Sequence, residues 1–149
     1  MADKGYKPFS EAGARGILSQ LIDALAYCHK NSVVHFDVKL DNIIFEEETQ
    51  KATLIDFGLC DFMEGDDHFT KRVGSEEYCA PELYLSEDTP YSGTKADIYA
   101  LGVVLYAMLT CTFPFNDKVN YQSKKIYAYT CTETKRMSQI WTTSCFVLS

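Results

Sequence analysis

Residues 96–109 constrain the fold most, because they are apolar almost all the way round a helix. Asp97 is the one charged side chain in this segment, and none follows it through Leu109. A helix that is hydrophobic on every side has to be covered by the rest of its domain. The longest apolar run, from Ala100 to Leu109, is also shorter than the roughly 20 residues that span a bilayer. The sequence therefore predicts a central buried helix in a domain that does not cross a membrane.

A second helix is predicted to begin after Ser10, whose hydroxyl suits a helix N-cap, and to end at Asn31. Between them, apolar residues recur at helical spacing on one face: Ala14, Ile17, Leu18, Leu21, Ile22, Leu25 and Cys28. This spacing is typical of an amphipathic helix.

Apolar stretches at 42–45 and 52–55 predict two short strands, joined by the acidic turn 46–51. An extended segment begins ahead of them at 33–34. Residues 59–73 are polar, so a mobile loop is expected there. The predicted fold class is α+β, mostly α with a small β hairpin.

The residues around this hairpin include groups that suit chemistry on phosphate. Asp37, Lys39 and Asn42 lie within a turn or two of one another, and Asp56 returns beside them across the hairpin. Carboxylate and amide oxygens are ligands for Mg²⁺, a lysine is a point charge for phosphate, and a second carboxylate can accept a hydroxyl proton. Taken singly, Asp37 and Asn42 would be turn caps and Lys39 a surface charge. Together they predict a site.

Residues 35–42 (His-Phe-Asp-Val-Lys-Leu-Asp-Asn) and 56–58 (Asp-Phe-Gly) resemble the catalytic loop and metal-binding turn of protein kinases. Ala-Pro-Glu at 80–82 resembles the end of the activation segment of that family, and the helix at Asp97 resembles its large central helix. The spacing of Asp, Lys and Asn, together with residues 74–78, resembles Ser/Thr kinases more than Tyr kinases. Within them, the calmodulin-dependent and energy-sensing branch is the nearest in character.

The resemblance implies transfer of the γ-phosphoryl group of ATP to Ser or Thr of protein substrates, with ATP and Mg²⁺ as cofactors. Asp37 would be the catalytic base, and Lys39 would neutralise the transferred group. Asn42 and Asp56 would hold Mg²⁺. These groups, with Ile44 as the floor beneath the adenine, would bind the nucleotide.

Other residues have supporting roles in the family. Ser75 would position the acceptor hydroxyl of the substrate. His35 and Phe57 would pack in a hydrophobic column that links the two lobes of a kinase. Gly58 would leave the turn after Asp56 free of a Cβ. Asp97 would accept backbone N–H groups of the catalytic loop.

Two expectations concern arginine. Glu82 would seek a buried arginine, and Arg136 is the candidate, with a solvated surface position as an equal alternative. The family also carries arginine between the His and the Asp of its catalytic loop, where this chain has Phe36. That arginine grips a phosphate on the activation segment. Phe36 cannot, so phosphorylation at Thr70 is expected to have little leverage through this position.

The resemblance covers residues 10–115 clearly and 116–149 only in pieces, as if a helix of the usual lobe were missing. No Gly-rich phosphate loop and no Val-Ala-Ile-Lys strand precede the catalytic loop. The chain 1–149 is therefore predicted to be one partial kinase domain, the C-terminal lobe with the N-terminal lobe absent.

A net charge of −7 without a Lys/Arg cluster argues against nucleic acid as a partner. Six scattered cysteines, with no C-x-x-C pair and no signal peptide, indicate reduced thiols and a cytoplasmic or also nuclear location. The predicted partners are protein substrates with Ser/Thr acceptors, and the oligomeric state is left open.

Two alternatives remain at this point. The chain could be a non-catalytic, kinase-like docking module, or a truncated inactive product that lacks a stable fold. The complete acidic set favours an enzyme, because a docking module has no need of Asp37 or Asp56.

Overall fold

The computed structural model describes residues 7–84 and 89–114. In chain order the elements are α1 (Glu11–Lys30), β1 (Val33–Val34), η2 (Leu40–Asn42), β2 (Ile43–Glu46), β3 (Lys51–Leu54), β4 (Asp61–Phe62), η3 (Pro81–Tyr84) and α2 (Gly93–Thr110). Strand β1 pairs with β4 and β2 pairs with β3, both antiparallel. The described residues thus contain two α-helices and two small antiparallel sheets, which agrees with an α+β class that includes a small hairpin.

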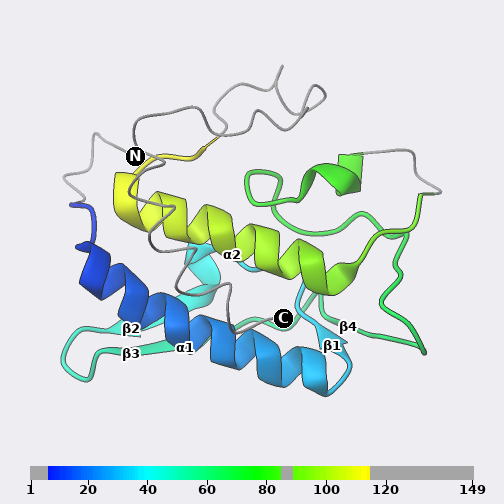
Figure 1. Cartoon of the computed structure of the whole chain (residues 1–149), viewed down its shortest axis with the longest axis horizontal. Coiled ribbons are helices and arrows are strands. Elements are labelled where there is room, and N and C mark those ends of the chain that lie inside the picture. Colours follow the sequence, from blue (N-terminus) through cyan, green and yellow to red (C-terminus); the bar gives the residue numbers. More distant parts are fainter. Residues whose placement is uncertain (1–6, 85–88, 115–149) are drawn as a thin grey trace.

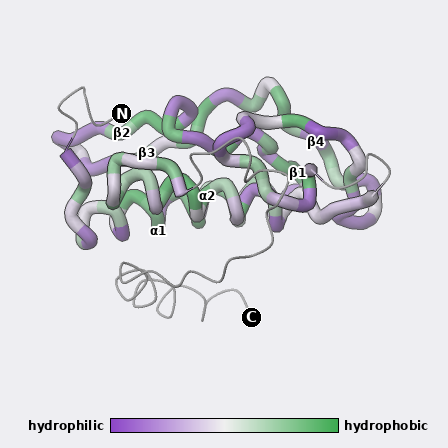
Figure 2. The backbone as a smooth tube through the Cα atoms, turned by 90° about the horizontal axis from the view of Figure 1, so that it is seen from above, coloured by the Kyte–Doolittle hydropathy of each residue, from purple (hydrophilic) through white to green (hydrophobic). Residues whose placement is uncertain are grey.

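The core lies between α1 and α2, which run beside each other (Figure 1). Hydrophobic residues gather along both helices (Figure 2). Leu21 and Leu25 of α1 are fully buried, as are Val104 and Leu105 of α2. The predicted amphipathic helix and central buried helix are therefore confirmed. Ser10 caps α1 as expected, because its Oγ accepts the N–H of Gly13 at 3.1 Å.

Besides apolar packing, one side chain of α1 makes hydrogen bonds to the β2–β3 hairpin. Gln20 accepts the N–H of Ala52 through Oε1 at 3.0 Å and donates from Nε2 to the carbonyl of Gln50 at 2.9 Å. Beyond the hairpin, the N–H of Ile55 donates to the carbonyl of Asn42 at 2.9 Å. This bond brings the end of β3 back to the loop that precedes β2, so Asp56 returns toward Asn42.

The structure differs from the sequence expectations at several positions. Strand β2 lies one residue later than expected and β3 one residue earlier, and α2 begins at Gly93 rather than at 96. The loop expected at 59–73 contains β4, and it joins Tyr91 through an isolated bridge at Phe69. A two-residue strand has no periodicity to read, and its pairing partner β1 lies far away in the sequence.

A second buried cluster joins the segment after β4 to the start of α2. Its buried members are Val34, Phe36, Ala80, Leu83, Tyr91 and Ala96. Gly93 makes this packing possible, because a Cβ there would lie 2.8 Å from the ring of Phe69. The cluster sets the path of the chain between β4 and α2.

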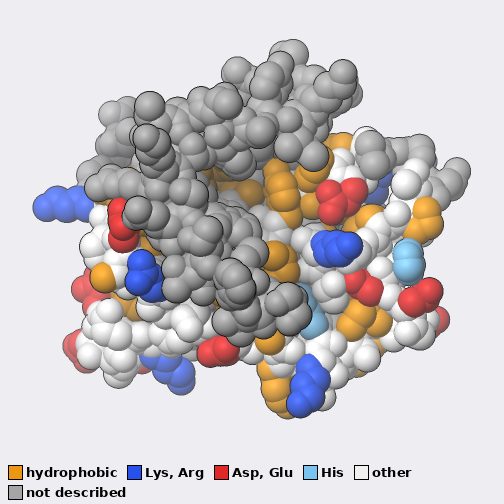
Figure 3. Space-filling model, in the orientation of Figure 1, with side chains coloured by type: hydrophobic (Ala, Val, Ile, Leu, Met, Phe, Trp, Pro, Cys, Tyr) orange, Lys and Arg blue, Asp and Glu red, His pale blue; other side chains and the backbone are white. Residues whose placement is uncertain are grey.

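No helix in residues 7–84 and 89–114 is long and apolar enough to span a membrane. On the face drawn in Figure 3, charged side chains of both signs are interspersed among the described residues.

Candidate active site

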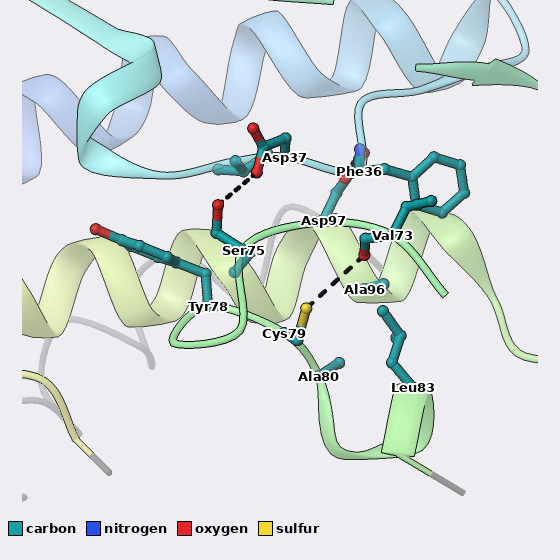
Figure 4. Close-up of a pocket in the computed structure, with 12 residues that line it drawn as sticks. Phe36, Asp37, Val73, Ser75, Tyr78, Cys79, Ala80, Leu83, Ala96 and Asp97 are labelled. Atoms are coloured by element: carbon teal, nitrogen blue, oxygen red, sulfur yellow. Dashed lines mark hydrogen bonds between the residues drawn. The ribbon is translucent and has the colours of Figure 1, made fainter. Parts of the chain in front are cut away.

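Asp37 is the centre of the candidate site. Its Oδ2 accepts a hydrogen bond from Lys39 Nζ at 2.6 Å and from Asn42 Nδ2 at 3.0 Å. Its Oδ1 accepts the hydroxyl of Ser75 at 2.9 Å, and Figure 4 shows Ser75 pointing at Asp37 from the facing segment. Lys39 Nζ also donates to Ser75 Oγ at 3.0 Å. Three residues singled out from the sequence therefore contact the carboxylate of a fourth, Asp37.

The electrostatics of this group favour its charged form. Burial raises the pKa of Asp37, but hydrogen bonds from Lys39, Ser75 and Asn42 and the charge of Lys39 outweigh it, so the pKa lies below its ordinary value. The hydrogen bond to Asp37 raises the pKa of Lys39, and Asp37, Asp41 and Asp56 raise it further by their charges. The site is an ionised carboxylate and an ammonium within an acidic neighbourhood.

Local hydrogen bonds shape the loop that carries these groups. Asn42 Nδ2 donates to the carbonyl of Asp37 at 2.8 Å, which closes residues 37–42 into a compact turn around η2. Phe36, directly before Asp37, has a φ of 64°, in the left-handed region that non-glycine residues rarely adopt. The surrounding contacts must therefore hold Phe36 in this conformation.

Asp97 of α2 is hydrogen-bonded to the backbone of the loop that carries Asp37. It is 1% exposed and accepts the backbone N–H groups of His35 at 2.9 Å and Phe36 at 2.8 Å. His29 of α1 makes a third contact with it, Nε2 to Oδ2 at 2.8 Å. The contacts expected of Asp97 are present. His29 was missed, because a histidine in the last turn of an amphipathic helix carries no signal of a distant partner.

His35 connects the loop to the turn at Asp56. Its Nδ1 lies 3.2 Å from the N–H of Asp37, and its Nε2 lies 3.2 Å from the carbonyl of Ile55. These partners fit a neutral ring with the proton on Nε2, since Nδ1 must accept and Nε2 must donate. The ring of Phe57 packs edge-on against His35, with centroids 4.7 Å apart.

Asp56 itself adopts a left-handed conformation, with a φ of 63°. Its side chain is exposed, and its Oδ1 accepts the N–H of Gly58 at 3.1 Å. A Cβ at Gly58 would lie 3.0 Å from that oxygen, so glycine leaves room for the carboxylate. The glycine therefore contributes space beside the carboxylate, while Asp56 makes the unusual turn.

Comparison with known proteins agrees with this geometry. Residues 2–145 match the family described as Protein kinase domain. The chain belongs to the protein kinase family.

Three relatives with similar sequences are named as kinases. It is 42% identical over 104 residues to "Serine/threonine-protein kinase ppk25" of Schizosaccharomyces pombe, covering 70% of this chain and 24% of the relative. It is 43% identical over 116 residues to "Probable serine/threonine-protein kinase KIN1 homolog" of Enterocytozoon bieneusi, covering 78% and 19%. It is 42% identical over 112 residues to "Sperm motility kinase 3A" of Mus musculus, covering 75% and 21%. The chain thus spans about a fifth to a quarter of the length of these relatives.

The remaining predicted residues of the kinase chain have separate positions. Ile44 is 48% exposed on β2. Glu82 lies in η3. Arg136 falls outside the described residues, so its pairing with Glu82 stays a prediction. Phe36 is buried among aromatic side chains rather than facing solvent.

Proposed function

We propose that this chain is the C-terminal lobe of a Ser/Thr protein kinase, and that its site transfers the γ-phosphoryl group of ATP to Ser or Thr of protein substrates. The observation that supports this best is the convergence of Lys39, Ser75 and Asn42 on the carboxylate of Asp37. The resemblance of the sequence suggests the lobe assignment, and the cluster suggests the reaction.

Asp37 is suited to orient an acceptor hydroxyl and to take its proton. Its pKa lies below the ordinary value of an aspartate, so the group is ionised at neutral pH, and an ionised carboxylate only accepts hydrogen bonds. The hydroxyl of Ser75, 2.9 Å from Oδ1, illustrates that an alcohol fits beside this carboxylate. Lys39 lies on the same carboxylate and would pair with negative charge on the transferred group.

Asn42 and Asp56 fit Mg²⁺ as part of its coordination. Asn42 uses Nδ2 for its two hydrogen bonds to Asp37, which leaves its Oδ1 for a cation. Asp56 is exposed and keeps one oxygen beyond its bond to Gly58. Within residues 7–84 and 89–114 no three His, Cys, Asp or Glu side chains gather around one point, so nucleotide phosphates and water would have to complete six-fold coordination. Bound Mg²⁺ would neutralise the phosphates and hold them for in-line transfer.

The 149-residue chain by itself is expected to bind Mg·ATP weakly and to turn over very slowly. Phosphoryl transfer depends on positioning and charge neutralisation. The sequence offers no Gly-rich loop to cover the phosphates with backbone amides. We place the protein in the cytoplasm, since its six cysteines are scattered along the sequence without a C-x-x-C pair, which is typical of reduced thiols.

The test is transfer of γ-phosphate from labelled ATP to a generic Ser/Thr substrate. The 149-residue chain should give negligible transfer, and a fusion that supplies a kinase N-terminal lobe upstream should restore it. Asp37→Asn and Asp56→Ala in that fusion should each abolish it, while Glu47→Gln at the exposed hairpin tip should not. A fusion that binds ATP but transfers equally well with Asp56→Ala would refute the assigned site.

A second candidate function is a docking module without catalysis. The observation in its favour is that Ile44, Phe57 and Leu59 are each more than 40% exposed, although they are large and apolar. Such a module would bind its partner equally well after Asp37→Asn. Loss of partner binding with that single substitution would exclude this alternative.

A further inference from the structure

Lys71 makes three contacts that join three parts of the fold. Its Nζ lies 2.6 Å from Asp61 Oδ2 in β4 and 4.5 Å from the ring centroid of Phe36 in the catalytic loop. Its backbone carbonyl accepts the hydroxyl of Tyr91, just before α2, at 2.5 Å. One residue in the middle of the 61–75 segment therefore contacts the start of that segment, the catalytic loop and the approach to α2.

The ring under Lys71 is held in place by other aromatic side chains. Phe36 is 7% exposed, and Phe69 packs edge-on against it at 4.9 Å, with Tyr91 at 6.4 Å. Phe69 and Tyr91 also exchange two backbone hydrogen bonds of 2.9 Å. A cation over the face of an enclosed ring is attracted by the quadrupole of that ring, and the attraction is stronger when water is excluded.

The charge of Lys71 is therefore compensated within the chain. The carboxylate of Asp61 forms an ion pair with its ammonium group, and the same group also contacts the face of the Phe36 ring. In the family that the sequence resembles, an arginine of the catalytic loop binds a phosphate on the activation segment. This chain has an aromatic ring, Phe36, in the catalytic loop, and a lysine, Lys71, in the 61–75 segment. The attraction joins the same two elements without any added group.

We propose that Lys71, held by Asp61 and Phe36, is a built-in clasp that fixes the 61–75 segment against the catalytic loop without phosphorylation. The clasp acts on the candidate site through the backbone that follows it. A Cβ at Gly74 would lie 2.5 Å from the carbonyl oxygen of Phe36, so the backbones of the 61–75 segment and the catalytic loop are in close contact there. Ser75 comes next, and it reaches Asp37 from this position.

The clasp has a defined means of release, because both attractions depend on one positive charge. Replacing the ammonium by a neutral group removes the ion pair and the cation–π contact together. The side chains of Lys71 and Asp61 are 34% and 48% exposed, so dissolved salt also weakens the ion pair. The segment should thus loosen at high ionic strength while α2 stays closed.

Amide hydrogen exchange on the full 149-residue chain tests the proposal. Lys71→Gln should speed exchange of the amides in 63–74 by about tenfold, the size expected for one exposed ion pair and one cation–π contact. Lys71→Arg should restore slow exchange, since arginine keeps the charge. Asp61→Asn should give a smaller increase. Lys95→Gln, which removes an exposed lysine outside the clasp, should leave these amides unchanged.

Exchange in α2 serves as the internal control for folding. Should Lys71→Gln open α2 as well, the wild-type protein in about 1 M salt gives the same test, because salt weakens the pair without a substitution. Unchanged exchange in 63–74, both with Lys71→Gln and in high salt, would overturn the proposal, as would failure of Lys71→Arg to restore protection. The result does not depend on phosphoryl transfer, so the clasp and the proposed activity can fail separately.

Discussion

Asp97 shows how much of the site depends on one buried carboxylate. It accepts two backbone N–H groups and the ring of His29, and its own side chain is almost fully enclosed. Removing it leaves the backbone N–H groups of His35 and Phe36 buried without this partner, which costs more than the hydrogen bonds themselves contribute.

Asp97→Ala should therefore lower the free energy of unfolding by about 2–4 kcal/mol. Urea denaturation followed by circular dichroism measures the change. Asp23→Ala, at an exposed position on α1, is the matched control and should change stability by less than about 0.5 kcal/mol. A loss for Asp97→Ala no larger than that of the control would mean that water replaces the carboxylate without cost.

Thr70 is exposed beside Lys71, and Phe36 offers no cation to a phosphate on it. In the fusion with an upstream lobe, Thr70→Ala should leave the phosphoryl-transfer rate nearly unchanged. The comparison is initial rates of phosphorylated and phosphatase-treated protein, with and without the substitution. A hundredfold drop would show that Lys71 or Arg72 grips a phosphate instead.

Among the elements, the first turn of α2 is hydrogen-bonded to a residue of the 61–75 segment. Ser92 is its N-cap, and Asp67 accepts the Ser92 hydroxyl and the N–H of Thr94, the latter at 3.1 Å. Burial raises the pKa of Asp67, but the hydrogen bonds from Ser92 and Thr94 outweigh it and hold the pKa below its ordinary value. The central helix and the segment are thus coupled at this end.

Because the pKa of Asp67 is lower in the folded protein, its contribution to stability is present above the unfolded pKa of about 3.9 and is lost as the pH falls through the folded value. Asp67→Asn should lower the free energy of unfolding at pH 7 by about 1 kcal/mol, because the hydrogen bonds from Ser92 and Thr94 to this side chain lose its negative charge. The difference from wild type should shrink below about pH 4. Urea midpoints at both pH values, with Glu64→Gln as control, measure this; a difference that grows with acid would contradict it.

The large elements could be predicted from the sequence, because each buries a periodic pattern. The helical spacing from Ala14 to Leu25 predicted α1, and the apolar run that ends at Leu109 predicted α2. Strand β4 could not be predicted, since two residues show no alternation and their pairing depends on the distant Val33 and Val34.

Only part of the candidate site could be predicted from the sequence. Motif spacing located Asp37, Lys39 and Asn42, because they lie close together in the sequence. The contacts of His29 with Asp97 and of Lys71 with Phe36 join residues far apart in the chain. Such contacts follow from the tertiary path, which no local pattern reveals.

For the molecule as a whole, α2 should be the last segment to open. Its buried residues come from nearly every side of the helix, so exposing it requires the core to separate. Amide exchange should be slowest in its middle turns, around Val103 to Leu105, and faster in the 59–73 segment. Equal rates in the two regions would contradict the fold.

The left-handed turn at Asp56 separates what folding requires from what chemistry requires. A φ of 63° calls for a residue that tolerates this conformation, and asparagine does so as well as aspartate. An amide oxygen can accept the N–H of Gly58 just as a carboxylate oxygen does. Asparagine at 56 would also remove one of three negative charges near Lys39. For a chain maintained only as a scaffold, the two residues are therefore interchangeable, and only a task that uses the negative charge distinguishes them.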